Sequence, residues 1–217
     1  MIDKIYNDCL NDISIKKIYD EIEIVEDEKG GWAYHNYDHV MSVTNIVTSI
    51  LTSLDYDKEF IAKAKIACLF HDVGALEGKD NHADRSYLFA KKYFLDNNIS
   101  FDGIDDVLEA IKIHSEGFDT DNIIALSLIL SDKLDIKQTR VAEAGKHIEG
   151  NRQYLHITDI IIKIEDKKLS VNFITDGKMD LEEFNEYYFT KKVFKSIASF
   201  AKRLALEYSV YIDNENV

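Results

Sequence analysis

The sequence predicts a mainly α-helical single domain that carries one small β-hairpin. Apolar residues recur at helical spacing along most of the 217 residues,. Only the segment 158–175 departs from this pattern, because it holds two short runs rich in isoleucine and valine, a composition typical of strands,. A chain of this length can bury one core, and no internal repeat or low-complexity linker divides it. We therefore expect one domain over residues 1–217.

The expected helices follow from apolar residues at spacings of three and four, and glycines such as Gly30-Gly31 and Gly74 mark helix ends,. The helices are expected over residues 3–27, 37–54, 58–72, 82–96, 103–114, 120–135, 138–149 and 180–209,. The last is the longest, with an apolar stripe from Phe184 to Tyr208. Phe200 and Tyr211 lie beyond that stripe, so the helix could pack on a second copy, and a homodimer is one expectation.

The predicted hairpin pairs residues 160–165 with residues 169–174 around the turn Asp166-Lys167-Lys168,. The surrounding segment 151–179 is too short to bury a core of its own. We therefore interpret it as an insertion in the helical domain.

Composition excludes several classes of protein. The net charge of −14 disfavours an extended nucleic-acid surface or an anionic membrane surface, although a local basic pocket for one phosphorylated ligand stays compatible with it,. No apolar run approaches the roughly 20 residues of a membrane span, and the N-terminus lacks a secretory pattern. Cys9 and Cys68 do not form a disulfide framework,, so a cytoplasmic location is expected. Cys68 is expected to be buried rather than a ligand.

The clearest chemical signal is a set of widely spaced histidines and aspartates: His39, His71, Asp72 and Asp132. Imidazole nitrogen and carboxylate oxygen together suit a divalent transition metal. Each residue lies near the end of a different predicted helix, or beside its neighbour, and such helices can converge in a bundle core. Taken alone, His71-Asp72 would equally fit a histidine at a helix end beside a solvated aspartate.

The sequence around these residues is more specific than the residues themselves. The order, the spacing and the flanking apolar residues resemble the HD superfamily of metal-dependent phosphohydrolases, in particular its small stand-alone bacterial members. The resemblance covers residues 34–141. It rests on the segments Tyr34–Val40, Ala67–Gly74, Asn81–Ser86, Ala110–Ser115 and Leu130–Asp135, of which His71-Asp72-Val73-Gly74 and Ser131-Asp132-Lys133 are the most specific. The implied fold is an HD-domain helical bundle with a hairpin insertion and a long C-terminal helix.

The resemblance implies a metal site. Its minimal form holds one ion through His39, His71, Asp72 and Asp132. Some members hold two ions, with Asp72 bridging and two further histidines, which would here be His82 and His114. The alternative is that His82 and His114 are polar helix ends that face solvent. The identity of the metal stays open among Mn, Fe, Co, Zn, Ni and Mg.

A phosphorylated substrate would also need cationic partners. Lys133 and Arg140 match the family's final motif, Arg85 lies at i+3 from His82 on one helical face, and Lys79 precedes it in a loop. Each could instead be a solvated surface cation. His35, four residues before His39, is expected in the pocket wall, whereas His147 and His156 are expected at the surface.

The expected activity is hydrolysis of a phosphate ester, of a nucleotide or another small phosphorylated metabolite, by a metal-activated water. Asp72 is the candidate catalytic residue. The general base stays open between Asp72 and the activated water, because Gly74, Ala75 and Leu76 stand where some relatives carry a glutamate. The missing Gly-Tyr-Pro segment disfavours cyclic-di-GMP phosphodiesterases. Two other classes remain: a diiron oxygenase of the same fold, and a non-catalytic module that binds metal or nucleotide.

Overall fold

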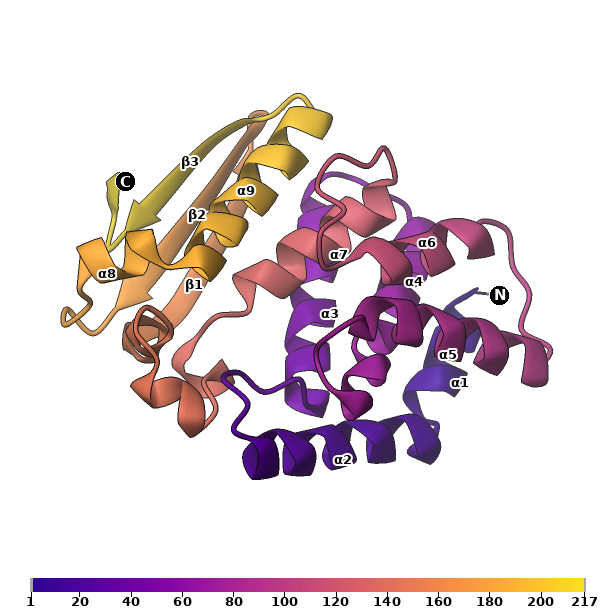
Figure 1. Ribbon diagram of the computed structural model, residues 1–217. Helices are drawn as coiled ribbons and strands as arrows, with labels where there is room; N and C mark the ends of the chain where they lie inside the picture. The colour runs from indigo at the N-terminus through magenta and orange to yellow at the C-terminus, as the bar shows by residue number, and fades with distance from the viewer. Residues whose placement is uncertain (1, 217) are drawn as a thin grey trace.

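The computed structural model describes residues 2–216 and has two parts that lie side by side (Figure 1). Helices α1–α7 form a bundle, and in the second part helix α9 lies against a four-stranded sheet. The elements are α1 (Ile2–Leu10), α2 (Ile13–Lys29), α3 (Tyr37–Ser53), α4 (Lys58–Phe70), η1 (Val73–Glu77), α5 (His82–Asp96), α6 (Ile104–Ile113), α7 (Ile123–Leu134), η2 (Gln138–Arg140), η3 (Ala144–His147), η4 (Asn151–His156), β1 (Ile157–Glu165), β2 (Lys168–Thr175), α8 (Leu181–Glu186), α9 (Tyr188–Arg203), β3 (Glu207–Ile212) and β4 (Glu215–Asn216). The mainly helical class is confirmed.

Helices α4 and α7 occupy the centre of the bundle. Every residue of α7 from Ile124 to Leu134 is buried, as expected for a helix that is apolar all round. The helices begin at side-chain caps: Asn36, Asp57 and Asn122 each accept a hydrogen bond from a backbone N–H three residues further on,. These caps fix where α3, α4 and α7 start, and therefore where their ends deliver side chains.

The predicted hairpin is present as β1 and β2, which pair antiparallel, with Ile162 opposite Val171. The turn residues Asp166 and Lys167 both have positive φ angles, which matches the twist of a tight hairpin. Leu169, Val171 and Phe173 alternate with more exposed neighbours and are fully buried in the core that the sheet shares with α9. That core continues onto α7 through Leu126 and Leu130, so the sheet packs onto the bundle.

The predicted helix over 180–209 is wrong. The chain instead breaks at Tyr187 between α8 and α9, leaves α9 at Arg203, and forms β3, which pairs parallel to β2. Ala205 ends the helix with a φ of 52°, and the Leu206 amide donates to the Ala201 carbonyl, a helix stop that usually uses glycine. Phe200 is fully buried and cannot serve as an exposed contact for a second copy.

Two further boundaries differ from the prediction. The expected helix over 3–27 divides because Asp12 accepts from the Ser14 amide and starts α2 anew. The expected helix over 138–149 is replaced by short 3-10 turns. Val141 pairs with Ala33 in an isolated bridge, and a Cβ on Gly145 would lie 2.0 Å from the Trp32 carbonyl oxygen, so this segment lies flat against the loop before α3. Across residues 2–216, no helix has both the length and the apolar composition that crossing a membrane requires.

Candidate metal centre

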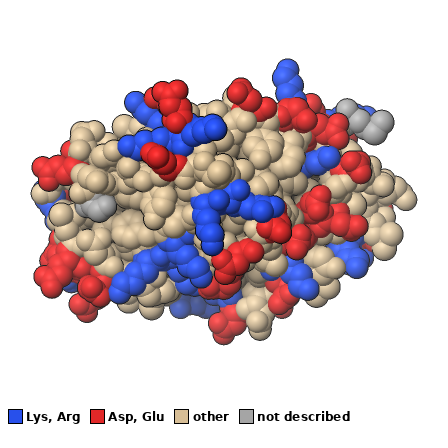
Figure 2. Space-filling view, turned by 90° about the horizontal axis from the view of Figure 1, so that it is seen from above, with Lys and Arg blue, Asp and Glu red and all other residues tan. Residues whose placement is uncertain are grey.

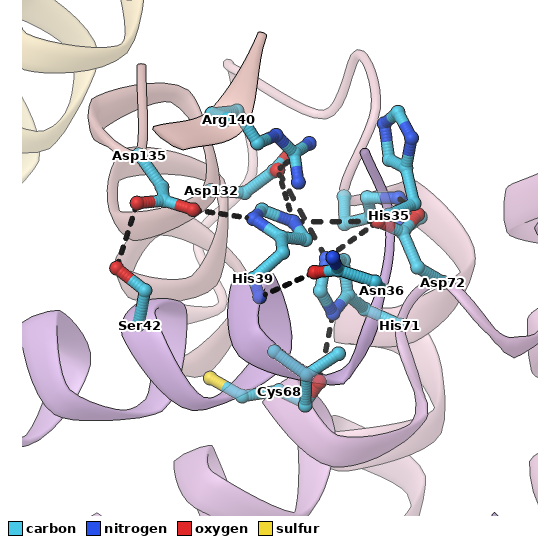
Figure 3. Close-up of polar contacts among 12 residues, drawn as sticks. His35, Asn36, His39, Ser42, Cys68, His71, Asp72, Asp132, Asp135 and Arg140 are labelled. Atoms are coloured by element: carbon cyan, nitrogen blue, oxygen red, sulfur yellow. Dashed lines mark hydrogen bonds and ion pairs between the residues drawn. The ribbon is translucent and has the colours of Figure 1, made fainter. Parts of the chain in front are cut away.

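Four predicted residues from distant parts of the chain converge in the bundle. His39 lies in the first turn of α3, His71 and Asp72 directly follow α4, and Asp132 lies in the last turn of α7. Each offers one ligand atom, and these atoms all lie within 4.8 Å of one another (Figure 3). All four residues are buried. The structure therefore assembles the group that the motif spacing predicts.

The polar atoms of this group fit a bound cation. Nε2 of His39, Nε2 of His71 and both carboxylate oxygens of Asp72 are buried and have no hydrogen-bond partner. Leaving such atoms unsatisfied is costly, and most buried polar atoms in proteins are paired. A divalent ion would satisfy all of them at once, and nitrogen and oxygen donors suit it.

The other ring nitrogen of each histidine fixes the orientation of the ring. His71 Nδ1 lies 2.7 Å from the Cys68 carbonyl oxygen, and His39 Nδ1 lies 2.7 Å from Asp135 Oδ2. A carbonyl or carboxylate oxygen accepts, so Nδ1 donates and the Nε2 lone pair faces the cluster. Metal-ligating histidines typically have this second partner. Asp135 was not among the residues predicted for the site; its position three residues after Asp132 was the available signal.

Asp72 also faces a second group, formed with His82 and His114. Asp72 Oδ1 lies 3.3 Å from Nε2 of His82 and 3.5 Å from Nε2 of His114. His82 opens α5 and His114 follows α6, as predicted. His114 is almost fully buried and His82 is partly buried, so the alternative of two solvent-facing helix ends does not describe them.

The two Nε2 atoms of this second group lie 2.9 Å apart. In both rings Nδ1 donates to a backbone carbonyl, that of Lys79 for His82 and that of Ile111 for His114. Burial lowers the pKa of His114 to about 4, so this ring is neutral near pH 7. Because Nδ1 is the donor in each ring, the two Nε2 atoms face each other, and a cation bound by both would relieve the contact.

Charges around the first group set its ionisation. Burial alone would raise the pKa of Asp72 and of Asp132, but interactions with His71 and Lys79 for Asp72, and with Lys133 for Asp132, hold both pKa values well below the usual range. Burial and Arg140 disfavour protonation of His39, yet the neighbouring carboxylates of Asp132, Asp135 and Asp72 outweigh them and raise its pKa to about 9. A proton and a divalent ion therefore compete for His39.

Two of the predicted phosphate-binding cations border the cluster. Lys133 Nζ lies 2.6 Å from Asp132 Oδ2, and Arg140 Nη2 lies 4.0 Å from Asp132 Oδ1. Arg140 is buried, and its Nη1 has no hydrogen-bond partner. Lys79, Lys133 and Arg140 line one cavity next to the cluster, and Lys79 Nζ lies 3.9 Å from Glu26 Oε1. The alternative of solvated surface cations does not fit Lys133 or Arg140.

Arg85 does not belong to this set. Its guanidinium donates to the carbonyl oxygens of Gly74, Gly78 and Asp80, so it holds the loop between α4 and α5 instead of facing the cavity. Gly74 allows this close packing, because a Cβ there would lie 2.4 Å from the His82 carbonyl oxygen. The prediction placed Arg85 by helical spacing from His82, which does not account for backbone acceptors in the loop.

His35 lies in the wall of the cavity, as predicted. Its amide and its Nδ1 both contact the buried carboxyl group of Glu26, at 2.8 and 2.5 Å. Burial raises the pKa of Glu26 and lowers that of His35 well below its usual value. Nothing in the surrounding sequence marks Glu26, which lies on the far end of an ordinary amphipathic helix.

The cluster opens into a cavity of about 1130 Å³. Asp72, Asp132, Lys133 and Arg140 lie on its wall, and the wall continues to residues at the start of α9. On the face shown in Figure 2, basic and acidic side chains are interspersed without a continuous basic patch. Lys79, Lys133 and Arg140 contribute positive charge to the wall of the cavity.

A family model described as HD domain matches residues 36–170. This is well over half of the chain and includes all six predicted metal ligands, so the chain belongs to the HD domain family. The family implies metal-dependent chemistry of the phosphohydrolase type, and the buried His/Asp cluster is compatible with a divalent metal. A search of the curated proteins found no match to this chain.

Proposed function

We propose that the protein is a metal-dependent phosphohydrolase that cleaves a phosphate ester of a small metabolite. The proposal rests on two sets of buried polar atoms that lie at one cavity and have no hydrogen-bond partner: candidate metal-ligand atoms, and a guanidinium nitrogen. The ligand atoms of His39, His71 and Asp72 lack partners, and so does Nη1 of the buried Arg140. A divalent cation fits the first kind, and a phosphoryl oxygen fits the second.

His39, His71, Asp72 and Asp132 would hold one ion, and Asp72, His82 and His114 a second. When bound, such ions supply Lewis-acid polarisation of a phosphoryl oxygen and acidify water. Lys133 and Arg140 bind the phosphate and neutralise its charge. Asp72 contributes to both ion sites, because its two oxygens face the two histidine groups.

The number of ions is testable by elemental analysis of the purified chain. We expect two ions per chain in the wild type and one in His114→Ala, because the first group stays intact. His156→Ala is the matched control, since the ring of this histidine pairs with the exposed carboxylate of Asp176 near β2 and belongs to neither candidate metal group. One ion in both wild type and His114→Ala would establish a single site.

Activity is tested with the metal-loaded full chain on a panel of phosphomonoesters, phosphodiesters and nucleotides. Asp132→Ala should lose the ion of the first group and with it turnover. Lys133→Ala should keep its metal but raise KM, since losing a charge-assisted contact costs about 1.5–3 kcal/mol. Lys146→Ala, an exposed lysine paired with Glu143, is the control with unchanged KM. Full turnover in Asp132→Ala would overturn the proposal.

The two alternatives make different demands in the same assays. An oxygenase would consume dioxygen and would require iron. A non-catalytic module would bind metal and ligand with no turnover on any member of the panel.

A further inference from the structure

One edge of the sheet has no partner strand. The strand order is β1-β2-β3-β4 (Figure 1), and within residues 2–216 no strand pairs with the outer side of β1. This strand is nine residues long, contains no proline and pairs with β2 in a regular register from Asp159 onward. Proteins usually protect a free edge with a short strand, a proline, a bulge or an inward-pointing charge. A long, regular edge without these features is a template for another strand.

Isoleucine side chains remain uncovered on both faces of β1. Ile160, Ile162 and Ile164 pack against the core of the C-terminal unit but are only partly buried. Val171, which lies opposite Ile162 on β2, is fully buried. On the other face of β1, Ile161 is 40% exposed. A strand added beside β1 would cover apolar surface on both faces, which favours the addition.

The backbone of β1 presents every second residue to the free edge. In β2, the Phe173 carbonyl accepts a hydrogen bond from the amide that directly follows β3, so it points toward β3. Successive residues of a strand point their backbone groups to opposite sides. Asn172 therefore points toward β1, and its partner Ile161 points back toward β2. The even-numbered residues of β1 face the free edge, and the Ile160 amide there donates to Asp159 Oδ1 at 2.9 Å.

The charges of β1 are complementary to those of a second β1. If two copies pair antiparallel about a two-fold axis at Ile161, Asp159 of each copy lies opposite Lys163 of the other,. Both pairs lie on the face of Ile161, because side chains two residues apart share a face. Opposite charges in such cross-strand positions stabilise a sheet, and like charges destabilise it. Within one copy, Asp159 Oδ1 has only a loose contact of 3.9 Å with Lys137 Nζ, so its carboxylate is available.

The neighbouring registers lack this complementarity. With Asp159 or Lys163 on the axis, that charge would face its own equivalent in the second copy. With Ile162 on the axis, Asp159 would face Glu165, a like charge. With Ile160 on the axis, neither Asp159 nor Lys163 would face an opposite charge. Cross-strand charges therefore select the register centred on Ile161.

We propose that two copies of this chain associate through β1, antiparallel and with Ile161 on the two-fold axis, so that the two four-stranded sheets join into one continuous sheet. The pairing satisfies the backbone groups of the free edge and covers the exposed isoleucines. A homodimer was expected from the C-terminal helix, but Phe200 is buried, and the interface proposed here lies on a different element. The proposal does not depend on the proposed function of the metal centre.

A cross-linking experiment tests the register. Two Ile161 residues on the axis would form a pair without direct hydrogen bonds, with Cα atoms about 4.5 Å apart, a separation that a disulfide can bridge. In the presence of oxidised glutathione, Ile161→Cys should give a non-reduced band at twice the 25.0 kDa of one chain. The natural Cys9 and Cys68 are buried. Lys163→Cys is the matched control, because its two copies would lie about 13 Å apart along the strands. Cross-linking of neither variant, or of both equally, would overturn the proposal.

Sedimentation velocity of the full chain tests the charges, and the wild type should sediment as a dimer. Lys163→Glu sets carboxylates opposite each other in both pairs and should weaken dimerisation by about 10-fold or more. Asp159→Lys should have the same effect, and the double variant Asp159→Lys/Lys163→Glu should recover the dimer because opposite charges face each other again. Lys17→Glu makes the same charge change on an exposed residue of α2 and should remain dimeric. A monomeric wild type, a dimer that survives both single substitutions, or a double variant without recovery would overturn the proposal.

Discussion

The helical bundle and the C-terminal unit (residues 141–216) differ in how their buried polar side chains are hydrogen-bonded. Every buried side-chain atom without a hydrogen-bond partner in residues 2–216 lies between His39 and Arg140. From residue 141 to residue 216 the buried polar side chains are paired. Tyr154 and Thr190 bond to each other at 3.0 Å, and Ser196 donates to the Val193 carbonyl at 2.7 Å.

This difference indicates that the bundle interior is arranged for ligand binding and the C-terminal core for stability. Unpaired buried groups reduce stability, and they persist where a ligand can satisfy them. The C-terminal unit, with aromatic residues such as Phe173, Phe184 and Phe200 fully buried, supplies packing without such cost. We expect the C-terminal core to dominate stability, and the metal centre to stabilise the fold only when it is loaded.

The largest expected effect is in the C-terminal core. Phe200→Ala should lower the free energy of unfolding by about 3–5 kcal/mol, because it removes a fully buried ring and leaves a cavity,. Urea unfolding at equilibrium measures the change. Tyr208→Ala, half-exposed on β3, is the control and should shift it by less than about 0.5 kcal/mol. Equal effects of the two substitutions would mean that the buried Phe200 ring stabilises the fold no more than an exposed tyrosine does.

The second effect belongs to the bundle. Adding a divalent metal at 100 times its dissociation constant should stabilise the chain by about 2.7 kcal/mol, a rise in melting temperature of about 5–10 °C for a chain of this size. Thermal unfolding with Mn²⁺ and with a chelator measures it. Asp132→Ala should show a smaller rise, because only the group of Asp72, His82 and His114 remains. If the melting temperature of the wild type does not change when metal is added, the cluster is not a metal site.

These two regions also differed in how far the sequence could predict them. The candidate metal ligands lie at helix ends, and helix ends carry local signals such as the Asn36 cap of α3, so the sequence could predict that His39, His71, Asp72 and Asp132 form one group. Strand β3 was missed, because it is stabilised by pairing with β2, about 40 residues earlier. The stop before it is Ala205, where a glycine would have signalled the end.

Residues whose roles depend on contacts distant in the sequence were also not predicted. Asp135 and Glu26 carry no motif of their own. Their roles come from contacts with His39 and His35 across the fold. Arg85 was misplaced for the converse reason, because its acceptors are backbone carbonyls in a loop whose conformation the sequence did not specify. Residues that act through a second residue are therefore harder to predict than ligands that face the site directly.

A third effect tests one such residue. Asp135→Ala should weaken metal binding by about 10- to 100-fold, because His39 loses the acceptor that orients its ring,. Competition with a chelator of known affinity measures the change. Asp135→Asn keeps an acceptor and should recover part of the affinity. Ser42→Ala, which removes only a hydroxyl that donates to Asp135, should have the smaller effect, and an unchanged affinity in Asp135→Ala would exclude the positioning role.

The smallest effect lies at the edge of the C-terminal unit and depends on pH. A hydrogen bond from Arg152, aided by the Gly150 amide, lowers the pKa of Glu183 from 4.5 to about 2. Because the folded-state pKa lies below the unfolded value, this carboxylate stabilises the fold above about pH 4.5 and loses that contribution as the pH falls towards 2,. Glu183→Gln should therefore lower the melting temperature at pH 7 by only about 1–2 °C, since solvent screens exposed pairs. The difference between the two proteins should shrink as thermal scans move from pH 6 to pH 3. A difference that stays constant across this range would mean that packing, and not the charge of Glu183, holds the Gly150 turn against Tyr187.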